Sequence, residues 1–210
     1  AMKIALDGMG GDWAPANPVS GAIEAIRRCP QIEKLYLVGR EAELKAEIDR
    51  HGPASARIEI VPASQVVEMG DSAIDSVRRK KDSSISRAVD LIRRGDAQAV
   101  VSAGHTGAAV AAAAVRLRTL PGVVRPGIAT VLPTQTNLFV LIDAGANIDA
   151  KPVHLGQYAI MGATYSEHVL GYKNPSVGLM SIGTEEVKGN DLTREAFKLL
   201  SALPINFRGN

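Results

Sequence analysis

Hydrophobic positions along the chain fall into short apolar runs that alternate with segments in which apolar residues recur every three or four positions. The short runs predict buried strands, and the periodic segments predict amphipathic helices. We expect strands at residues 3–6, 35–38, 58–61, 99–102, 128–132, 138–142 and 176–181, and the start of another at 205–207. We expect one helix that begins at Asn17-Pro18, and others at residues 41–50, 85–92, 108–115, 153–170 and 191–203.

Capping residues mark the ends of several expected helices. A short polar side chain can accept a hydrogen bond from the first turn of a helix, and glycine or proline can end one. By this criterion helices start at Asn17-Pro18, at Ser83 or Ser84 and at Asp191, and end at His51-Gly52-Pro53, Gly95 and Pro204.

Two stretches depart from the alternation. Residues 64–83 are polar and charged with no clean period, and we predict no regular element there. Residues 133–137 are polar and separate two expected strands, which we therefore expect to form a hairpin.

Strands that alternate with helices predict an α/β fold with a doubly wound, mostly parallel sheet between two helical layers. Aromatic residues make up only 4% of the chain while hydrophobic residues make up 46%, so small aliphatic side chains form the core. Such a core suits a parallel sheet covered by helices on both faces. We find no linker or internal repeat and expect a single α/β domain over residues 1–210.

Charge and cysteine content exclude several classes of function. The net charge of +2 gives no general argument for binding nucleic acid. The single cysteine, Cys29, excludes an internal disulfide and a cysteine metal site, and it fits a reducing compartment. The longest apolar run, residues 107–115, is far shorter than the roughly 18 residues that a membrane-spanning helix needs.

Four turns rich in glycine and polar residues follow expected strands, at residues 7–12, 102–107, 143–147 and 182–186. Ligands of an open parallel sheet bind beyond the carboxyl ends of its strands, so we expect these turns to contribute to one site. The turn at 102–107 (Ser-Ala-Gly-His-Thr-Gly) precedes a helix, and its N–H groups predict an anion site. None of the turns has the glycine spacing of a dinucleotide-binding or phosphate-loop motif.

Two further features each have two interpretations. The basic run at residues 78–81 is either a solvated loop or a phosphate clamp, and it could equally attract an acidic partner. His105 is either a neutral donor or acceptor for a ligand or a turn histidine bonded to the backbone. Cys29 is distant from every glycine turn and no Gly-x-Ser-x-Gly motif occurs, which favours a reaction whose nucleophile is a bound small molecule.

Several segments together resemble the bacterial phosphate acyltransferases of phospholipid synthesis, the PlsX family. They are Ala-Leu-Asp-Gly-Met-Gly-Gly-Asp-Trp-Ala-Pro at 5–15, Arg-Lys-Lys-Asp-Ser-Ser at 79–84, the turns at 102–107 and 143–147, Gln-Tyr-Ala-Ile-Met-Gly at 157–162, and residues 178–183 with Glu185, Lys188 and Gly189. The resemblance covers essentially the whole chain. It departs at His105, where the family usually has Asn, at Gln135 to Asn137, where it usually has a Gly nearby, and near Ser72, where it usually has Pro.

The resemblance implies a fold similar to phosphotransacetylase and isocitrate dehydrogenase, and a homodimer. It implies an enzyme that moves a long-chain fatty acyl group from acyl carrier protein to inorganic phosphate. We expect neither a cofactor nor a metal. It further implies a cytoplasmic protein with peripheral contact at the inner face of the bacterial membrane. Family members continue past residue 210, so we expect this chain to be truncated relative to them, with the membrane contact in the part that follows.

We hypothesise that phosphate attacks the thioester carbonyl directly. The residues that we expect to bind phosphate and substrate are Gly10, Gly11, Arg79, Lys80, Lys81, Ser102, Gly104, Thr106, Gly107, Gly183 and Thr184. The residues that we expect to act in catalysis are Asp7, Asp12, His105 and Asn147, with Asp143 as a further orienting carboxylate. The alternatives are a phosphotransacetylase-like enzyme for short-chain acyl-CoA and a non-catalytic scaffold that binds acyl carrier protein or a membrane partner.

Overall fold

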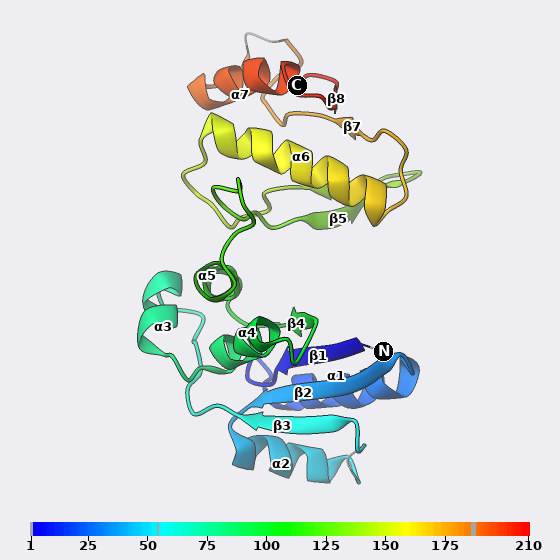
Figure 1. The fold of residues 1–210 in the computed structure, drawn as a ribbon, viewed down its shortest axis with the longest axis vertical. Coiled ribbons are helices and arrows are strands. Elements are labelled where there is room, and N and C mark those ends of the chain that lie inside the picture. Colours follow the sequence, from blue (N-terminus) through cyan, green and yellow to red (C-terminus); the bar gives the residue numbers. More distant parts are fainter. Residues whose placement is uncertain (1, 54, 186–187) are drawn as a thin grey trace. The chain divides into compact units, whose positions relative to one another are not determined.

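The computed structural model describes residues 2–53, 55–185 and 188–210. The chain forms two compact units, residues 1–118 and 119–210 (Figure 1). The expectation of one domain over residues 1–210 stays a prediction, because this division concerns the contacts within each unit.

The first unit is built on a four-stranded parallel sheet in the order β3-β2-β1-β4. Its strands are β1 (Met2–Asp7), β2 (Ile32–Gly39), β3 (Ile58–Pro62) and β4 (Ala99–Val101). The ends of each strand lie within three residues of the predicted ends. The prediction succeeds here because each strand coincides with one short apolar run in the sequence.

Helices cover both faces of this sheet. Successive side chains of a strand point to opposite faces, so alternate residues of β2 pack against different helices. On β2, Leu35 and Leu37 pack against the helices α1 (Ala16–Arg28) and α2 (Glu41–Arg50). Tyr36 and Val38 lie instead in the cluster formed with α4 (Ser84–Arg94). The unit therefore has three layers, and the prediction of a doubly wound α/β fold is confirmed.

The helix ends agree with the predicted caps only in part. Ser83 caps α4 by accepting a hydrogen bond from the Ser86 N–H, and Gly95 ends this helix in a left-handed conformation (φ 80°), as predicted. The predicted cap at Asn17 is wrong: α1 begins at Ala16, and its N-cap residue is Pro15, which offers no side-chain acceptor.

Two helices of the first unit differ from the prediction. Helix α3 (Ala73–Arg79) lies in the stretch where we predicted no element, and it buries only Ser76 and Val77. Seven residues are too few to display a helical period. Helix α5 (Thr106–Arg116) begins two residues earlier than predicted, so the end of the predicted anion-binding turn belongs to its first turn.

The second unit packs two helices against short strands. An antiparallel hairpin of β5 (Thr130–Pro133) and β6 (Leu138–Leu141) confirms the predicted pairing. Helices α6 (Pro152–His168) and α7 (Asp191–Ser201) contact each other, and β7 (Ser176–Val177) pairs in parallel with β8 (Asn206–Phe207).

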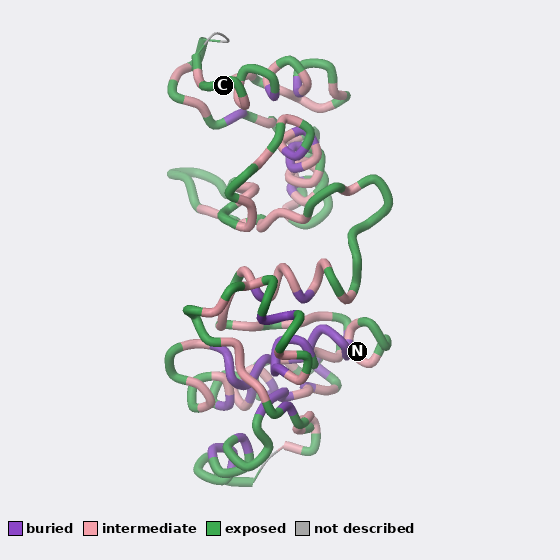
Figure 2. Tube along the Cα trace, turned by 90° about the vertical axis from the view of Figure 1, so that its left-hand side faces the viewer, coloured by how far each residue is buried: buried purple, intermediate pink, exposed green. Residues whose placement is uncertain are grey.

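The core of the second unit forms around Ala159, Leu179, Ala196 and Leu200. Figure 2 shows the buried positions in purple. Two details correct the prediction: β7 spans two residues rather than six, and Asn190 rather than Asp191 caps α7, because its side chain accepts from the Thr193 N–H. Among the described residues, no helix has the length and apolar character needed to cross a bilayer.

Substitution of Leu37 tests the packing of the sheet in the first unit. The Leu37 side chain is 0% exposed, so Leu37→Ala should lower the free energy of unfolding by about 2–5 kcal/mol. Leu120→Ala is the matched control, because Leu120 is 76% exposed and should change stability by less than about 0.5 kcal/mol. Urea unfolding followed by circular dichroism measures both, and equal losses would contradict the assigned core.

Candidate functional site

The strand order of the first unit reverses between β1 and β4. The chain proceeds from β1 outward through β2 to β3, and then returns to place β4 on the other side of β1. Leu6 and Val101 are partners in the register, so the carboxyl ends of these two strands lie side by side. In an open parallel sheet such a reversal leaves a crevice in which ligands bind.

A buried carboxylate joins the two strand ends. Asp7, at the end of β1, is 4% exposed, and its Oδ2 accepts a hydrogen bond of 2.8 Å from the Ser102 hydroxyl just beyond β4. Its Oδ1 accepts from the Met9 N–H at 3.1 Å, and the Ser102 oxygen accepts from the Gly104 N–H at 3.1 Å. Asp7 thus holds both turns in place, and its expected part in catalysis stays a prediction.

Glycines allow the two turns to touch. A Cβ at Gly10 would lie 2.7 Å from the Asp7 Oδ2 and 2.8 Å from the Gly104 nitrogen, and a Cβ at Gly104 would lie 3.0 Å from the Gly10 Cα. Gly11 has a φ of 99°, a conformation that side-chain-bearing residues rarely adopt. Asp7, Gly10, Gly11, Ser102 and Gly104 are therefore brought together as predicted.

The first turn of α5 presents the free donors of this site. The Gly104 N–H is bonded to Ser102 and the Ala108 N–H to His105. The N–H groups of Thr106 and Gly107 have no acceptor among the residues that the structure describes. Such unpaired N–H groups, together with the helix dipole, favour an anion. In the predicted cradle the Gly104 N–H is therefore already paired, whereas the His105 N–H, like those of Thr106 and Gly107, has no acceptor among the described residues. Thr106 is exposed.

His105 is bonded to the backbone through both ring nitrogens. Its Nδ1 accepts from the Ala108 N–H at 3.2 Å, and its Nε2 lies 2.9 Å from the carbonyl oxygen of Asp71. Because a carbonyl can only accept, the Nε2 carries the proton and donates. Of the two interpretations of His105, the structure therefore favours the turn histidine that caps α5.

The basic run is divided between bound and free side chains. The Lys80 ammonium donates to the carbonyl of Val66 at 2.8 Å and to the Asp71 Oδ2 at 2.5 Å. This hydrogen bond from Lys80 is the largest cause that lowers the pKa of Asp71. Arg79 and Lys81 are exposed, and their side chains form no ion pair within the described part of the chain.

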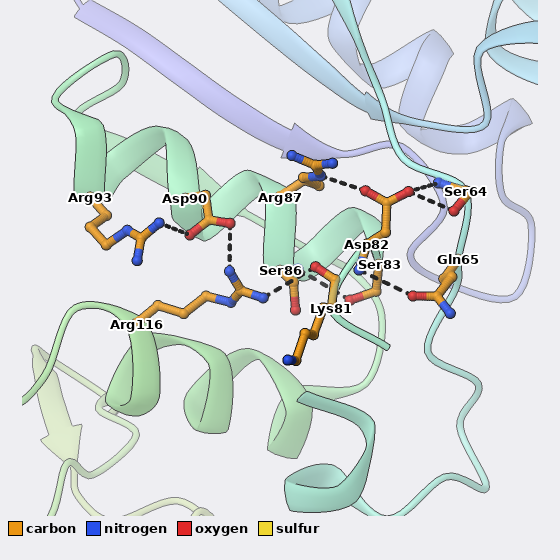
Figure 3. A network of polar contacts seen from close by, with 10 residues as sticks. All are labelled: Ser64, Gln65, Lys81, Asp82, Ser83, Ser86, Arg87, Asp90, Arg93 and Arg116. Carbon is orange, nitrogen blue, oxygen red and sulfur yellow. Dashed lines mark hydrogen bonds and ion pairs between the residues drawn. The ribbon is translucent and has the colours of Figure 1, made fainter. Parts of the chain in front are cut away.

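A polar network fastens the segment that follows the basic run (Figure 3). Arg116, near the end of α5, pairs with Asp90 of α4 at 2.5 Å and donates to the carbonyl of Lys81 at 3.2 Å. Asp82 accepts from the hydroxyl and N–H of Ser64 and from Arg87. These contacts, led by the Ser64 hydroxyl, lower the pKa of Asp82 to about 2.

In the second unit, the turn at residues 143–147 is held by its own polar groups. The Asp143 carboxylate accepts from the N–H groups of Ile128, Ala146 and Asn147. Burial alone would raise the pKa of Asp143, but these hydrogen bonds lower it on balance. The Asn147 amide donates to Asp143 and to the Tyr158 hydroxyl, whose pKa burial raises. Asn147 therefore has a structural role in this turn.

The other predicted residues lie on exposed loops or in the second unit. Asp12 is exposed in the turn after β1, and Thr184 is exposed in the turn after β7. A Cβ at Gly183 would lie 3.0 Å from atoms of Glu185 and Lys188. Glu186, the last residue of that predicted turn, lies outside the described residues.

Sequence reasoning missed the residues that connect the predicted ones. Asp71 bridges Lys80 and His105, and Arg116 with Asp90 ties α5 to α4. The signal for α3 was limited to Ala73, Ile74 and Val77 at helical spacing, which is too short a pattern to predict a helix.

Gly10→Ala tests the contact between the two turns. The new Cβ would force the Gly104 backbone or the Asp7 carboxylate to move, so we expect a loss of about 1–3 kcal/mol in the free energy of unfolding. Gly21→Ala in α1 is the control: a Cβ there meets nothing within 4 Å, and alanine is up to about 1 kcal/mol better than glycine in a helix. Denaturant unfolding should show opposite signs, and a Gly10→Ala variant as stable as the wild type would contradict the assigned contact.

The lowered pKa of Asp82 predicts a pH dependence of stability. Its carboxylate stabilises the fold above the unfolded-state pKa of about 3.9, and this contribution is lost as the pH falls toward about 2. The difference in unfolding free energy between wild type and Asp82→Asn should therefore shrink over that interval. Arg87→Met, which removes one partner of Asp82, should give a smaller difference. A difference that stays constant from pH 7 to pH 2 would refute this assignment.

Comparisons with known proteins agree with the resemblance seen in the motifs. Residues 2–210 match the family described as "Fatty acid synthesis protein". The phosphate acyltransferase of Akkermansia muciniphila is 53% identical over 100% of this chain, and that of Halothermothrix orenii is 47% identical over 100% of it. The chain spans 62% and 63% of the length of these two relatives.

Solved structures show the same fold. A phosphotransacetylase from Streptococcus pyogenes matches with a TM-score of 0.71 at 18% identity, over 99% of this chain and 67% of that one. A branched-chain phosphotransacylase from Enterococcus faecalis matches with a TM-score of 0.59 at 13% identity, over 100% of this chain and 67% of that one. Since the family match includes nearly every residue and the fold is the one expected, the chain belongs to the "Fatty acid synthesis protein" family.

Proposed function

We propose that this chain carries the phosphate site of a phosphate acyltransferase, which moves a long-chain fatty acyl group from acyl carrier protein to inorganic phosphate. One observation carries the proposal. The ends of β1 and β4 meet at the reversal of strand order, and the unpaired N–H groups of Thr106 and Gly107 lie just beyond that point. Family membership and the names of the relatives supply the reaction class.

Phosphate binds at the first turn of α5 in this proposal. The two free N–H groups donate to its oxygens, and the positive end of the helix dipole favours its charge. The exposed Thr106 hydroxyl adds a third donor. The nearby Asp7 carboxylate accepts hydrogen bonds from Ser102 and Met9 on its two oxygens, which limits its repulsion of the anion.

The reaction is a direct displacement. A phosphate oxygen forms a bond to the thioester carbonyl carbon, the carbon–sulfur bond breaks, and the carrier leaves as a thiolate that takes up a proton. The exposed cations Arg79 and Lys81 offset the negative charge of the incoming phosphate. An N–H of Gly11 would stabilise the developing oxyanion, a contribution of about 3–4 kcal/mol for such a donor.

The proposal includes three further elements that rest on the family resemblance alone. The acyl donor is acyl carrier protein, the enzyme is a homodimer, and it works in the cytoplasm with peripheral contact at the inner face of the membrane. The short-chain acyl-CoA alternative differs only in the acyl donor, so one assay separates the two.

The assay mixes palmitoyl acyl carrier protein with inorganic phosphate and protein, and follows free carrier thiol and acyl phosphate by mass spectrometry. It uses the 210-residue chain and a version extended with the part of the Akkermansia muciniphila relative that this chain does not span. We expect phosphate-dependent thiol release from the extended chain. Release from acetyl-CoA in place of the carrier would favour the short-chain alternative, and no release in either arm, while the relative itself is active, would overturn the proposal.

Two variants at one position separate the backbone donor from the hydroxyl. Thr106→Pro removes both, and proline suits the first position of a helix after the extended backbone of His105 (ψ 103°). Loss of a hydrogen bond to a charged group should raise the KM for phosphate about tenfold or more. Thr106→Ala keeps the N–H and should have the smaller effect. Equal KM values for Thr106→Pro and the wild type would contradict binding at this turn.

A further inference from the structure

A line of polar contacts connects the basic run to the first turn of α5. The Lys80 ammonium donates to the Asp71 carboxylate at 2.5 Å, and the Asp71 carbonyl oxygen accepts from the His105 Nε2 at 2.9 Å. The other ring nitrogen of His105 accepts from the Ala108 N–H at 3.2 Å. The line thus runs from the C-cap of α3 through the loop before α3 to the N-cap of α5.

The loop that carries Asp71 is held at several points. The Asp71 Oδ2 also accepts from the Glu68 N–H at 2.8 Å, and the Lys80 ammonium also donates to the Val66 carbonyl at 2.8 Å. Lys80 therefore holds this loop at Val66 and at Asp71. The Lys80 and Asp71 side chains are each 30% exposed, so water only partly screens their attraction.

Helix α3 also packs directly on the first turn of α5. A Cβ added to Gly107 would lie 3.1 Å from the Ala73 Cβ and 3.1 Å from the His105 Cε1. The Ala73 side chain and the His105 ring therefore leave no room for a side chain at Gly107, and α3 and α5 pack against each other here. The polar line and this contact act on the same turn.

We propose that Lys80 is a positioning residue that, through Asp71 and His105, sets the direction of the Thr106 and Gly107 N–H groups. The role differs from a phosphate clamp, because two of the three ammonium hydrogens already serve acceptors of the protein. Turning the ammonium toward a ligand would leave the Asp71 carboxylate without its ion-pair partner. What the turn binds rests on the proposed function, whereas the coupling within the chain does not.

Two substitutions isolate the coupling. Lys80→Met keeps the aliphatic stem and removes the ammonium. His105→Asn keeps an acceptor for the Ala108 N–H, because asparagine is a good N-cap residue, but its shorter side chain does not reach the Asp71 carbonyl. If Lys80 acts through His105, its effect on α5 must vanish once the link is cut, which a double-mutant cycle measures.

The readout is hydrogen exchange of the Ala108 and Ala109 amides, whose N–H groups donate to the His105 Nδ1 and the His105 carbonyl. We expect Lys80→Met to accelerate their exchange about tenfold in the otherwise wild-type chain, and by less than about twofold in the His105→Asn chain. Lys81→Met is the matched control, since the Lys81 ammonium is exposed and has no partner among the described residues. It should leave the exchange unchanged.

Acceleration of equal size in both backgrounds, or acceleration confined to α3, would overturn the proposal. If Lys80→Met fails to fold, Asp71→Asn replaces it, because it keeps the carbonyl that binds His105 and removes the charge that holds Lys80. In the extended chain, Lys80→Met should raise the KM for phosphate about threefold or more with a smaller change in kcat. An inactive extended chain would count against the proposed function, while the exchange cycle would still decide the coupling.

Discussion

The hydrogen bond between the buried Asp7 carboxylate and the Ser102 hydroxyl is the contact on which the arrangement of the site depends. It joins the ends of two strands whose residues are 95 positions apart in the chain. A buried carboxylate is costly unless hydrogen bonds satisfy it, so both turns must adopt the conformations that supply donors. The close approach of Gly10 and Gly104 follows from this requirement, because any Cβ would separate the turns.

The order of the strands gives this contact its functional meaning. Helices α1 and α2 pack on one face of the sheet and α4 on the other, so the chain changes sides between β3 and β4. This change of side leaves a crevice at the carboxyl ends of the neighbouring strands β1 and β4. Helix α5 begins there, and its unpaired N–H groups are the natural place for an anion.

Much of this arrangement was predictable from the sequence, because strand position and sheet class depend on local apolar patterns. The glycine turns at residues 7–12 and 102–107 were predictable as a pair, since parallel strands bring their carboxyl ends to one edge. Helix α3 was not, because seven residues with two buried side chains carry no usable period. The start of α5 was placed too late, because Thr106 and Gly107 are weak helix formers and their place in the helix depends on the His105 cap.

The hydrogen bonds between residues distant in the sequence could not be predicted, because they depend on how the elements pack. Lys80 was expected to face phosphate, and its bond to Asp71 depends on a helix that the pattern did not predict. Asn147 was expected to act in catalysis, yet its amide is engaged by Asp143 and Tyr158. The type of a residue indicates which chemistry it can perform. The fold determines whether its donors and acceptors are already bonded to other groups of the protein.

The link between His105 and Asp71 ends on a main-chain oxygen, and this has a consequence for how the turn can vary. Every amino acid has a carbonyl, so a substitution at position 71 keeps that acceptor. Position 105 contributes through its side chain instead, because the His105 ring accepts a hydrogen bond from the Ala108 N–H and donates one to the loop that carries Asp71. We therefore expect the identities of residues 71 and 105 to vary independently as far as this contact is concerned, although the two residues touch.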